Sequence, residues 1–141
     1  MRQRAEVPEL DEELDGIERY RSAEGFDILV GTSARANDRL TFRLARPDDF
    51  WLHVAATSGS HVVVRNPDNL PRLPRQTLRQ AAALAAHHSK GRAGGRVAVD
   101  VTRVRFVSKA RGAPAGQVQI RRHDTLQVSP AERPDRTESS G

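Results

Sequence analysis

The sequence predicts an α+β domain in which two main helices pack on a mixed or antiparallel sheet. Its 141 residues suit one domain with a buried core. Short apolar runs bounded by glycine or proline predict strands, and two longer segments have helical spacing. The order of the predicted elements is β-α-β-β-α-β-β-β, which favours antiparallel or mixed pairing.

The first half of the domain is predicted to contain three strands and one helix. Thr32 and Ser33 can cap a helix over Ser33–Leu44, in which Leu40 and Leu44 share one side. The segment 56–60 is rich in turn-forming residues and would join two of the strands. These strands are expected at Phe26–Gly31, Phe50–Val54 and His61–Arg65.

The second half begins with a helix predicted over Arg75–Lys90, where Gly91 stands in the position of a left-handed cap. Valines then alternate from Val97 to Val101, but the phase slips at Val104. The slip predicts either a bulge or a segment that buries its two faces in turn. A closing hairpin is expected from the runs Gln117–Arg121 and Thr125–Val128.

Both ends of the chain are poor in core-forming residues. Residues 1–23 form an acidic segment for which we expect disorder or a short amphipathic helix over Asp11–Arg21. Residues 129–141 contain two prolines and are expected to be a disordered tail. The folded domain is therefore expected to span residues 24–128.

Charge is distributed unevenly along the chain. The formal net charge is +5, from 23 Lys+Arg and 18 Asp+Glu. Residues 1–30 hold nine acids and four bases, whereas residues 90–123 hold nine bases and the single acid Asp100. A basic excess of this size indicates a polyanionic partner such as a nucleic acid. Few aromatic residues are available for stacking, which favours recognition of backbone and shape over bases.

Other functions receive less support from the sequence. The absence of cysteine excludes disulfides and thiolate metal sites and fits a cytoplasmic protein, and no apolar run is long enough to span a membrane. His53 and His61 could face one another across a hairpin and hold a metal, but a zinc site requires a third protein ligand. No nucleophile-elbow or phosphate-loop spacing occurs. We therefore expect no enzyme activity, no metal and no cofactor.

Two alternatives remain open. The basic face could dock on an acidic protein partner, with the acidic N-terminal segment folded over it as a mask. Less favoured is a small metal-dependent hydrolase that uses His53, His61 and an aspartate.

Several segments resemble one known family in the order in which they occur. They include a glycine that ends a strand, an Asn-Asp-x-Leu-Thr helix, an Asp-x-Trp-Leu-His strand, a Gly-Ser-His strand start and an alanine-rich helix that ends in serine. The corresponding residues are Gly31, Asn37–Thr41, Asp49–Val54, Gly59–Val64, Ala82–Lys90, Val97–Val104, Lys109–Val118 and Thr125–Pro130. Over about residues 25–130 the chain resembles NFACT-R, the RNA-binding domain of the NFACT proteins.

The resemblance implies a function in RNA binding. NFACT proteins act in ribosome-associated quality control, where they bind the large ribosomal subunit and recruit tRNA. The resemblance therefore implies contact with structured RNA, either tRNA or ribosomal RNA. The family's large N-terminal domain and coiled coil are not in this sequence, so we expect a stand-alone NFACT-R protein, and nothing in the sequence predicts its oligomeric state.

The expected site residues follow from the basic positions and from the family motifs. Arg103 and Arg105 alternate along a predicted strand and would share one face, and the glycines near Lys109 and Arg111 would let a phosphate approach the backbone. The expected RNA-binding residues are Arg35, Asn37, Arg39, His53, Lys90, Arg92, Arg96, Arg103, Arg105, Lys109 and Arg111. The expected structural motif consists of Gly31, Trp51, Gly59, Ser60, His61 and Ser89.

Overall fold

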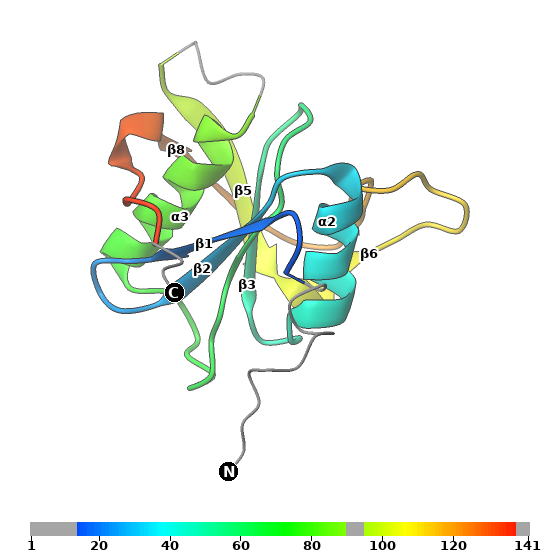
Figure 1. Cartoon of the computed structure of the whole chain (residues 1–141), viewed down its shortest axis with the longest axis horizontal. Helices are drawn as coiled ribbons and strands as arrows, with labels where there is room; N and C mark the ends of the chain where they lie inside the picture. Colours follow the sequence, from blue (N-terminus) through cyan, green and yellow to red (C-terminus); the bar gives the residue numbers. More distant parts are fainter. Residues whose placement is uncertain (1–13, 90–94, 138–141) are drawn as a thin grey trace.

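A computed structural model describes residues 14–89 and 95–137 of the chain. Its centre is a six-stranded sheet with the strand order β1-β2-β4-β3-β5-β8, in which every neighbouring pair is antiparallel (Figure 1). The strands are β1 (Ile17–Arg21), β2 (Asp27–Gly31), β3 (Phe50–Val54), β4 (Val62–Val64), β5 (Val97–Arg103) and β8 (Asp124–Val128). The predicted α+β class is confirmed, with the sheet antiparallel throughout.

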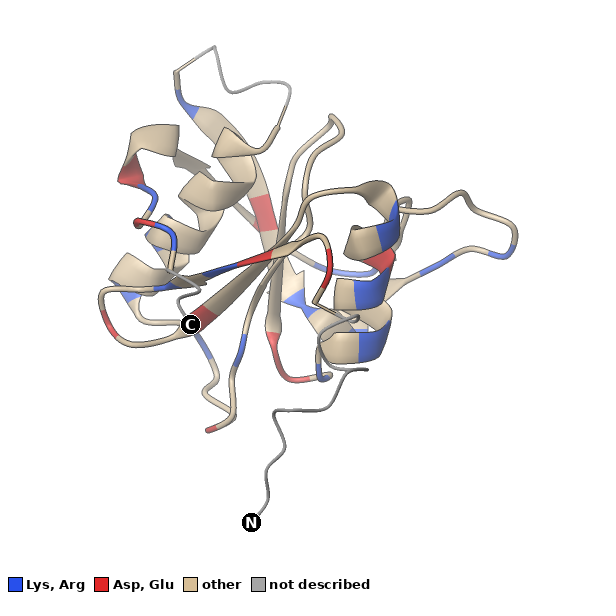
Figure 2. Cartoon of the chain, in the orientation of Figure 1, with Lys and Arg blue, Asp and Glu red and all other residues tan. Residues whose placement is uncertain are grey.

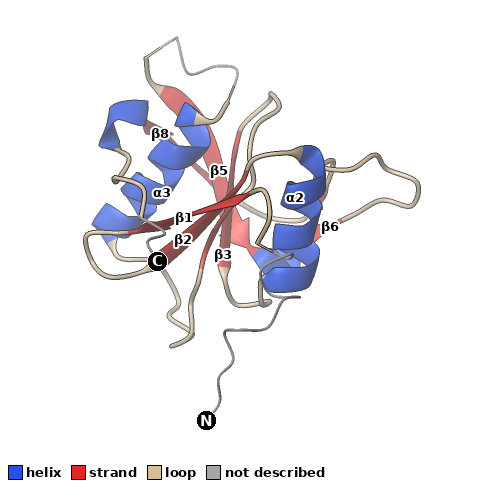
Figure 3. Cartoon of the chain, viewed as in Figure 1, coloured by secondary structure: helices blue, strands red, loops and turns tan. Residues whose placement is uncertain are grey.

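Helices cover both faces of this sheet (Figure 3). On one face lies α3 (Arg75–His87). On the other lies α2 (Ala34–Arg39), which continues directly into a π-helical turn, η1 (Leu40–Leu44). The Oγ of Ser33 accepts a hydrogen bond from the Ala36 amide at 3.1 Å, so Ser33 caps α2 as predicted.

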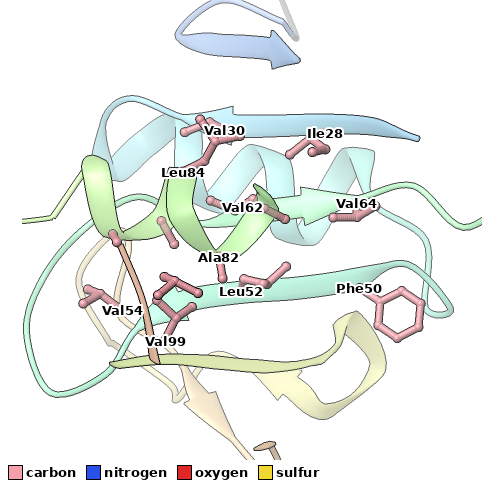
Figure 4. Packing of buried hydrophobic residues seen from close by; sticks show 14 of the residues in the cluster. Ile28, Val30, Phe50, Leu52, Val54, Val62, Val64, Ala82, Leu84 and Val99 are labelled. Atoms are coloured by element: carbon pink, nitrogen blue, oxygen red, sulfur yellow. The ribbon is translucent and has the colours of Figure 1, made fainter. Parts of the chain in front are cut away.

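Alternate residues of the central strands bury their side chains on opposite faces of the sheet. Towards α3, the apolar cluster includes Leu52, Val62 and Val99 together with Ala82 and Leu84 of the helix (Figure 4). Towards α2 and η1, Leu29, Trp51 and Val63 pack with Ala36 and Leu40. The strands therefore read as continuous apolar runs because both of their faces are covered.

The N-terminal part of the sheet corrects one prediction. Ile17–Arg21 is a strand, paired with β2 from Ile17↔Gly31 to Arg21↔Asp27, and not the end of a helix. Ile17 packs into the cluster beside α2, whereas Tyr20 packs into the cluster beside α3. A separation of three residues therefore places these two side chains on opposite faces of a strand, although it also matches helical spacing. The rest of the predicted helix, residues 11–16, includes positions 11–13, which lie outside the described residues.

The predicted closing hairpin is also wrong. The register of β5 against β3 runs without a break to Arg103, and the chain then forms a 3₁₀ turn, η3 (Val104–Phe106). This turn carries the chain to the other face of the sheet, so the phase slip marks two faces buried in turn. A separate two-stranded sheet follows, made of β6 (Val107–Ser108) and β7 (Gln119–Ile120). The last strand, β8, pairs with β5 instead of with β7.

The C-terminal segment is ordered over its described part, contrary to the prediction of a disordered tail. Ser129 caps a short 3₁₀ turn, η4 (Pro130–Glu132), through a capping box. Arg79 of α3 donates two hydrogen bonds to the Glu132 carboxylate, at 2.7 and 3.0 Å, and this hydrogen bonding lowers the pKa of Glu132 to about 2. Further along, the Thr137 amide donates to the carbonyl of Arg19 at 3.0 Å, so the segment lies beside the edge strand β1.

The junction between β2 and α2 depends on a glycine without a side chain. Asn37, in the first turns of α2, points its Oδ1 back over Gly31 and accepts a hydrogen bond from the His61 amide at 3.0 Å. Its Nδ2 donates to the carbonyl of Gly59 at 3.4 Å. A Cβ at position 31 would overlap Oδ1 of Asn37 and stand 3.1 Å from its Cα. The glycine therefore lets one amide side chain join three segments.

We expect Gly31→Ala to destabilise the fold by about 2–4 kcal/mol, because the new methyl group displaces Asn37 from its buried partners. Urea unfolding measures the change. Gly112→Ala is the control, since a Cβ there meets nothing within 4 Å and only its φ of +77° opposes substitution. That variant should lose about 1 kcal/mol. Equal losses in the two variants would contradict the steric role of Gly31.

Candidate nucleic-acid interface

A polar cleft of about 850 Å³ lies on the face of the sheet that carries α2. Its walls come from the start of α2, from the end of β3, from the loop between β3 and β4, and from the segment Ala115–Val118. Hydroxyl groups and imidazoles supply most of its polar side chains: Thr32, Ser33, Thr57, Ser58, Ser60, His53, His61 and His88. The cleft therefore offers hydrogen-bonding groups and little acidic charge.

A buried chain of hydrogen bonds forms the back of the cleft. The indole Nε1–H of Trp51 donates to Oγ1 of Thr41 at 3.1 Å, and Oγ1 lies 2.7 Å from Nδ1 of His61. The other ring nitrogen of His61, Nε2, lies 3.1 Å from the carbonyl oxygen of Gly116. A carbonyl can only accept, so Nε2 carries the proton of the neutral ring, and Nδ1 accepts from the Thr41 hydroxyl. The chain is thus satisfied at each step with His61 uncharged.

Burial keeps His61 in this neutral form. Removal of the ring from water, together with a smaller effect of the neighbouring His53, lowers the pKa of His61 to about 4. Burial also lowers the pKa of His53. The His53 ring stacks on Trp51 with centroids 5.7 Å apart and meets the edge of His61 at 5.6 Å. His53 is only half-buried and lines the cleft, so it presents a neutral polar ring to an occupant.

The loop between β6 and β7 is held against α2 by Asp38 and Lys109. Oδ1 of Asp38 accepts a hydrogen bond from the Gly116 amide at 2.9 Å and lies 3.2 Å from Nζ of Lys109. The same ammonium donates to the carbonyls of Pro114 and Gln117, both at 2.8 Å. Lys109 is one of the predicted RNA-binding residues. In the structure, its ammonium group holds together the loop that forms one wall of the cleft.

The motif residues predicted from the family come together at this place. Asn37, Trp51, Gly59, Ser60 and His61 line the cleft, and Gly31 lies behind it through its contact with Asn37. Ser89, just after α3, forms a bridge with Gly59. A Cβ on Gly59 would stand 3.1 Å from Cγ1 of Val54, so this strand start also needs a glycine to fit.

The predicted basic residues divide into two groups. Arg35 and Arg111 are exposed and Arg39 is half-buried, on α2 and on the β6–β7 loop, where Figure 2 shows basic residues on the outer side of the helix and along the loop. Nη2 of Arg39 donates to the carbonyl of Asp15. Arg96 is exposed at the start of β5. Lys90 and Arg92 lie outside the described residues.

Arg103 and Arg105 lie elsewhere and do not share one strand face. Arg103 ends β5, where it donates to the carbonyl of Leu70 at 2.6 Å and lies 3.6 Å from Asp48. Arg105 belongs to η3 and pairs with the same carboxylate of Asp48. The two guanidinium groups are therefore held by one aspartate just before β3, whereas the cleft lies at the end of that strand.

Sequence reasoning did not single out three residues of this region. Thr41 and Asp38 belong to the Asn-Asp-x-Leu-Thr segment, but their partners are 20 and 78 residues away in sequence. Gly116 contributes a backbone carbonyl, which no sequence pattern reveals.

No group of three or more histidine, aspartate or glutamate side chains is placed to hold a metal ion among residues 14–89 and 95–137. His53 and His61 do face one another, as predicted, but their rings lie edge to face. Within the described part of the chain, no helix has the length and apolar character needed to cross a membrane.

Comparison with known proteins places the chain in a family. A family model described as the NFACT protein RNA binding domain matches residues 17–122, from the first residue of β1. The chain belongs to this family. The resemblance noted from the sequence motifs is thereby confirmed.

Relatives and solved structures agree with this assignment. The Rqc2 homolog RqcH of Bacillus subtilis is 42% identical over 116 residues, which cover 81% of this chain and 19% of that protein. The ribosome quality control complex subunit NEMF homolog of Drosophila melanogaster is 29% identical over 70 residues, which cover 50% of this chain and 7% of that protein. A solved structure of the C-terminal part of the fibronectin/fibrinogen-binding protein from Streptococcus suis superposes with a TM-score of 0.76 at 33% identity, and covers 89% of this chain and 57% of that one. The NFACT-R chain thus spans about a fifth of the length of RqcH.

We expect the stability of this NFACT-R domain to fall as the pH drops below about 6.5. The unfolded chain binds a proton at His61 near pH 6.5, whereas the folded chain binds it only near pH 4. The stabilisation is therefore complete above pH 6.5 and is lost as the pH falls towards 4, by roughly 3 kcal/mol. Urea unfolding at pH 7.5, 5.5 and 4.0 measures this loss.

His61→Gln serves as the comparison, because glutamine can donate to the Gly116 carbonyl but does not titrate. This variant should be less stable than the parent at pH 7.5 and should lose less stability between pH 6.5 and 4. A loss as large as that of the parent would mean that other groups cause the pH dependence.

Proposed function

We propose that this chain binds structured RNA, either tRNA or large-subunit ribosomal RNA, mainly through the sugar–phosphate backbone. The observation that carries the proposal is the assembly of the NFACT-R motif residues into one polar cleft beside exposed arginines. Hydroxyls and a neutral imidazole can hydrogen-bond phosphate oxygens and the ribose 2′-OH. Arginines on α2 and on the β6–β7 loop would supply the charge that phosphates require.

The basic residues would then have two different roles. Arg35, Arg39 and Arg111 would contact phosphates, and Lys90, Arg92 and Arg96 would add to this contact. Arg103, Arg105 and Lys109 act as positioning residues, because Asp38 and Asp48 already hold their charges. All of them add to the potential: residues 103–123 contain six bases and no acid.

The names of the relatives point to a ribosomal setting. RqcH is described as an Rqc2 homolog, and the NEMF homolog as a subunit of the ribosome quality control complex. We therefore extend the proposal to an association with the large ribosomal subunit in the cytoplasm. Because this chain matches only about a fifth of RqcH, the proposal covers RNA contact and not the whole activity of such a protein.

Binding of the full chain to tRNA and to a DNA duplex of equal length, measured over a salt series, tests the proposal. We expect tRNA to bind more tightly, with a log–log slope that indicates several released counterions. Arg35→Gln and Arg111→Gln should each weaken binding about 3- to 10-fold and reduce the slope by about 1.

Arg75→Gln is the matched control for these variants. Arg75 is an exposed arginine in the first turn of α3, on the other face of the sheet, and its loss should leave both affinity and slope unchanged. Equal behaviour of all three variants would contradict the proposed face. If neither nucleic acid binds near physiological salt, the RNA proposal fails, and the basic region serves a protein partner or is a solvated surface.

A further inference from the structure

A second cavity, of about 530 Å³, opens on the face of the sheet that carries α3. It shares no lining residue with the cleft described above. Phe50, Leu73 and Val101 give it an apolar floor that continues the core beneath α3. Figure 4 shows Phe50 at one end of the row of core side chains, opposite Val54. Its volume lies within the range of about 300–1,000 Å³ that is usual for small-molecule sites.

Two guanidinium groups at this cavity lie over aromatic rings. The Arg103 guanidinium lies 4.6 Å from the centroid of Phe50, and that of Arg122 lies 5.0 Å from the centroid of Phe106. Hydrogen bonding to Leu70 also fixes Arg103. Guanidinium planes fixed in this way can stack on a nucleobase, and little further side-chain entropy is lost when they do.

The cavity also carries an excess of positive charge. Arg72, Arg103 and Arg122 line it, against the single carboxylate of Asp124. Arg72 and Arg122 are exposed, and within residues 14–89 and 95–137 neither forms an ion pair with a carboxylate. Arginine forks of this kind match the geometry of a phosphate group.

We propose that this cavity binds a nucleoside monophosphate, with the base on the guanidinium planes and the apolar floor and with the phosphate on Arg72 and Arg122. The nucleotide could be free or could stand at the end of an RNA chain, since the chemistry of recognition is the same. The inference is independent of the proposed RNA-binding cleft, because the two sites lie on opposite faces of the sheet.

Titration of the isotope-labelled full chain with AMP, followed by amide chemical shifts, tests this inference. We expect shifts at Val101–Arg103 and Arg122–Asp124 and a Kd of about 0.1–1 mM, as befits a small ligand in an open site. Adenosine and inorganic phosphate should each bind at least about 5-fold more weakly than AMP, because each makes only half of the contacts. Arg72→Gln and Arg122→Gln should weaken AMP binding about 3- to 10-fold, whereas Arg75→Gln should not.

The inference fails if AMP shifts no amide of the cavity, if phosphate alone binds as tightly as AMP, or if both arginine variants bind AMP like the parent. A pentanucleotide RNA with a 5′-phosphate distinguishes the two sources. Tighter binding than AMP identifies an RNA end, and equal or weaker binding identifies a free nucleotide. Arg35→Gln and Arg111→Gln should weaken tRNA binding but not AMP binding, so each proposal can fail without the other.

Discussion

The hydrogen bonds from Trp51 through Thr41 and His61 to Gly116 tie three separate parts of the fold together. Trp51 belongs to the centre of the sheet, Thr41 to the turn that follows α2, and Gly116 to the loop between β6 and β7. Each polar atom that takes part in these hydrogen bonds is buried or nearly so. Loss of one partner would therefore cost more free energy than a surface hydrogen bond contributes. The cleft keeps its shape because its back wall consists of these fixed groups.

Ion pairs between distant segments determine which of the basic side chains are held in place. Asp38 and Asp48 come from other segments of the chain and hold Lys109, Arg103 and Arg105 in place. The charge of these residues still contributes to the long-range potential, while the contacts with the two aspartates hold their side chains in position. Other arginines are exposed, among them arginines on α2, on the β6–β7 loop and around the second cavity. A high arginine content therefore supplies both scaffold and contact surface.

Much of this fold could be predicted from the sequence, and the failures have physical reasons. Strands β2, β3 and β4 and helix α3 follow from local apolar runs and breakers, so their positions were predicted to within a few residues. Ile17 and Tyr20 misled the prediction because a strand buried on both faces has no period of two. The pairing of β8 with β5 was missed because the switch of faces at Val104 leaves only an ambiguous slip in the pattern.

The parts of the site that come from short sequence motifs could be predicted. The family motifs indicate Asn37, His53 and His61, and the structure brings these residues into one cleft. The roles of Asp38, Asp48 and Gly116 depend on contacts between distant segments and on backbone atoms, which composition and spacing do not encode. For the same reason the sequence could not separate the arginines that hold the fold from those that face solvent.

The C-terminal segment that lies beside β1 also affects the self-association of the molecule. An edge strand offers unpaired amide and carbonyl groups to any extended chain that it meets. Here the carbonyl of Arg19 is already used by the Thr137 amide, and Arg136 stands 3.5 Å from the Glu18 carboxylate. Pro134 and the charged residues around it are poor templates for a further strand. The last described residues thus close one side of a very apolar sheet, and this closure limits strand-to-strand aggregation at that edge.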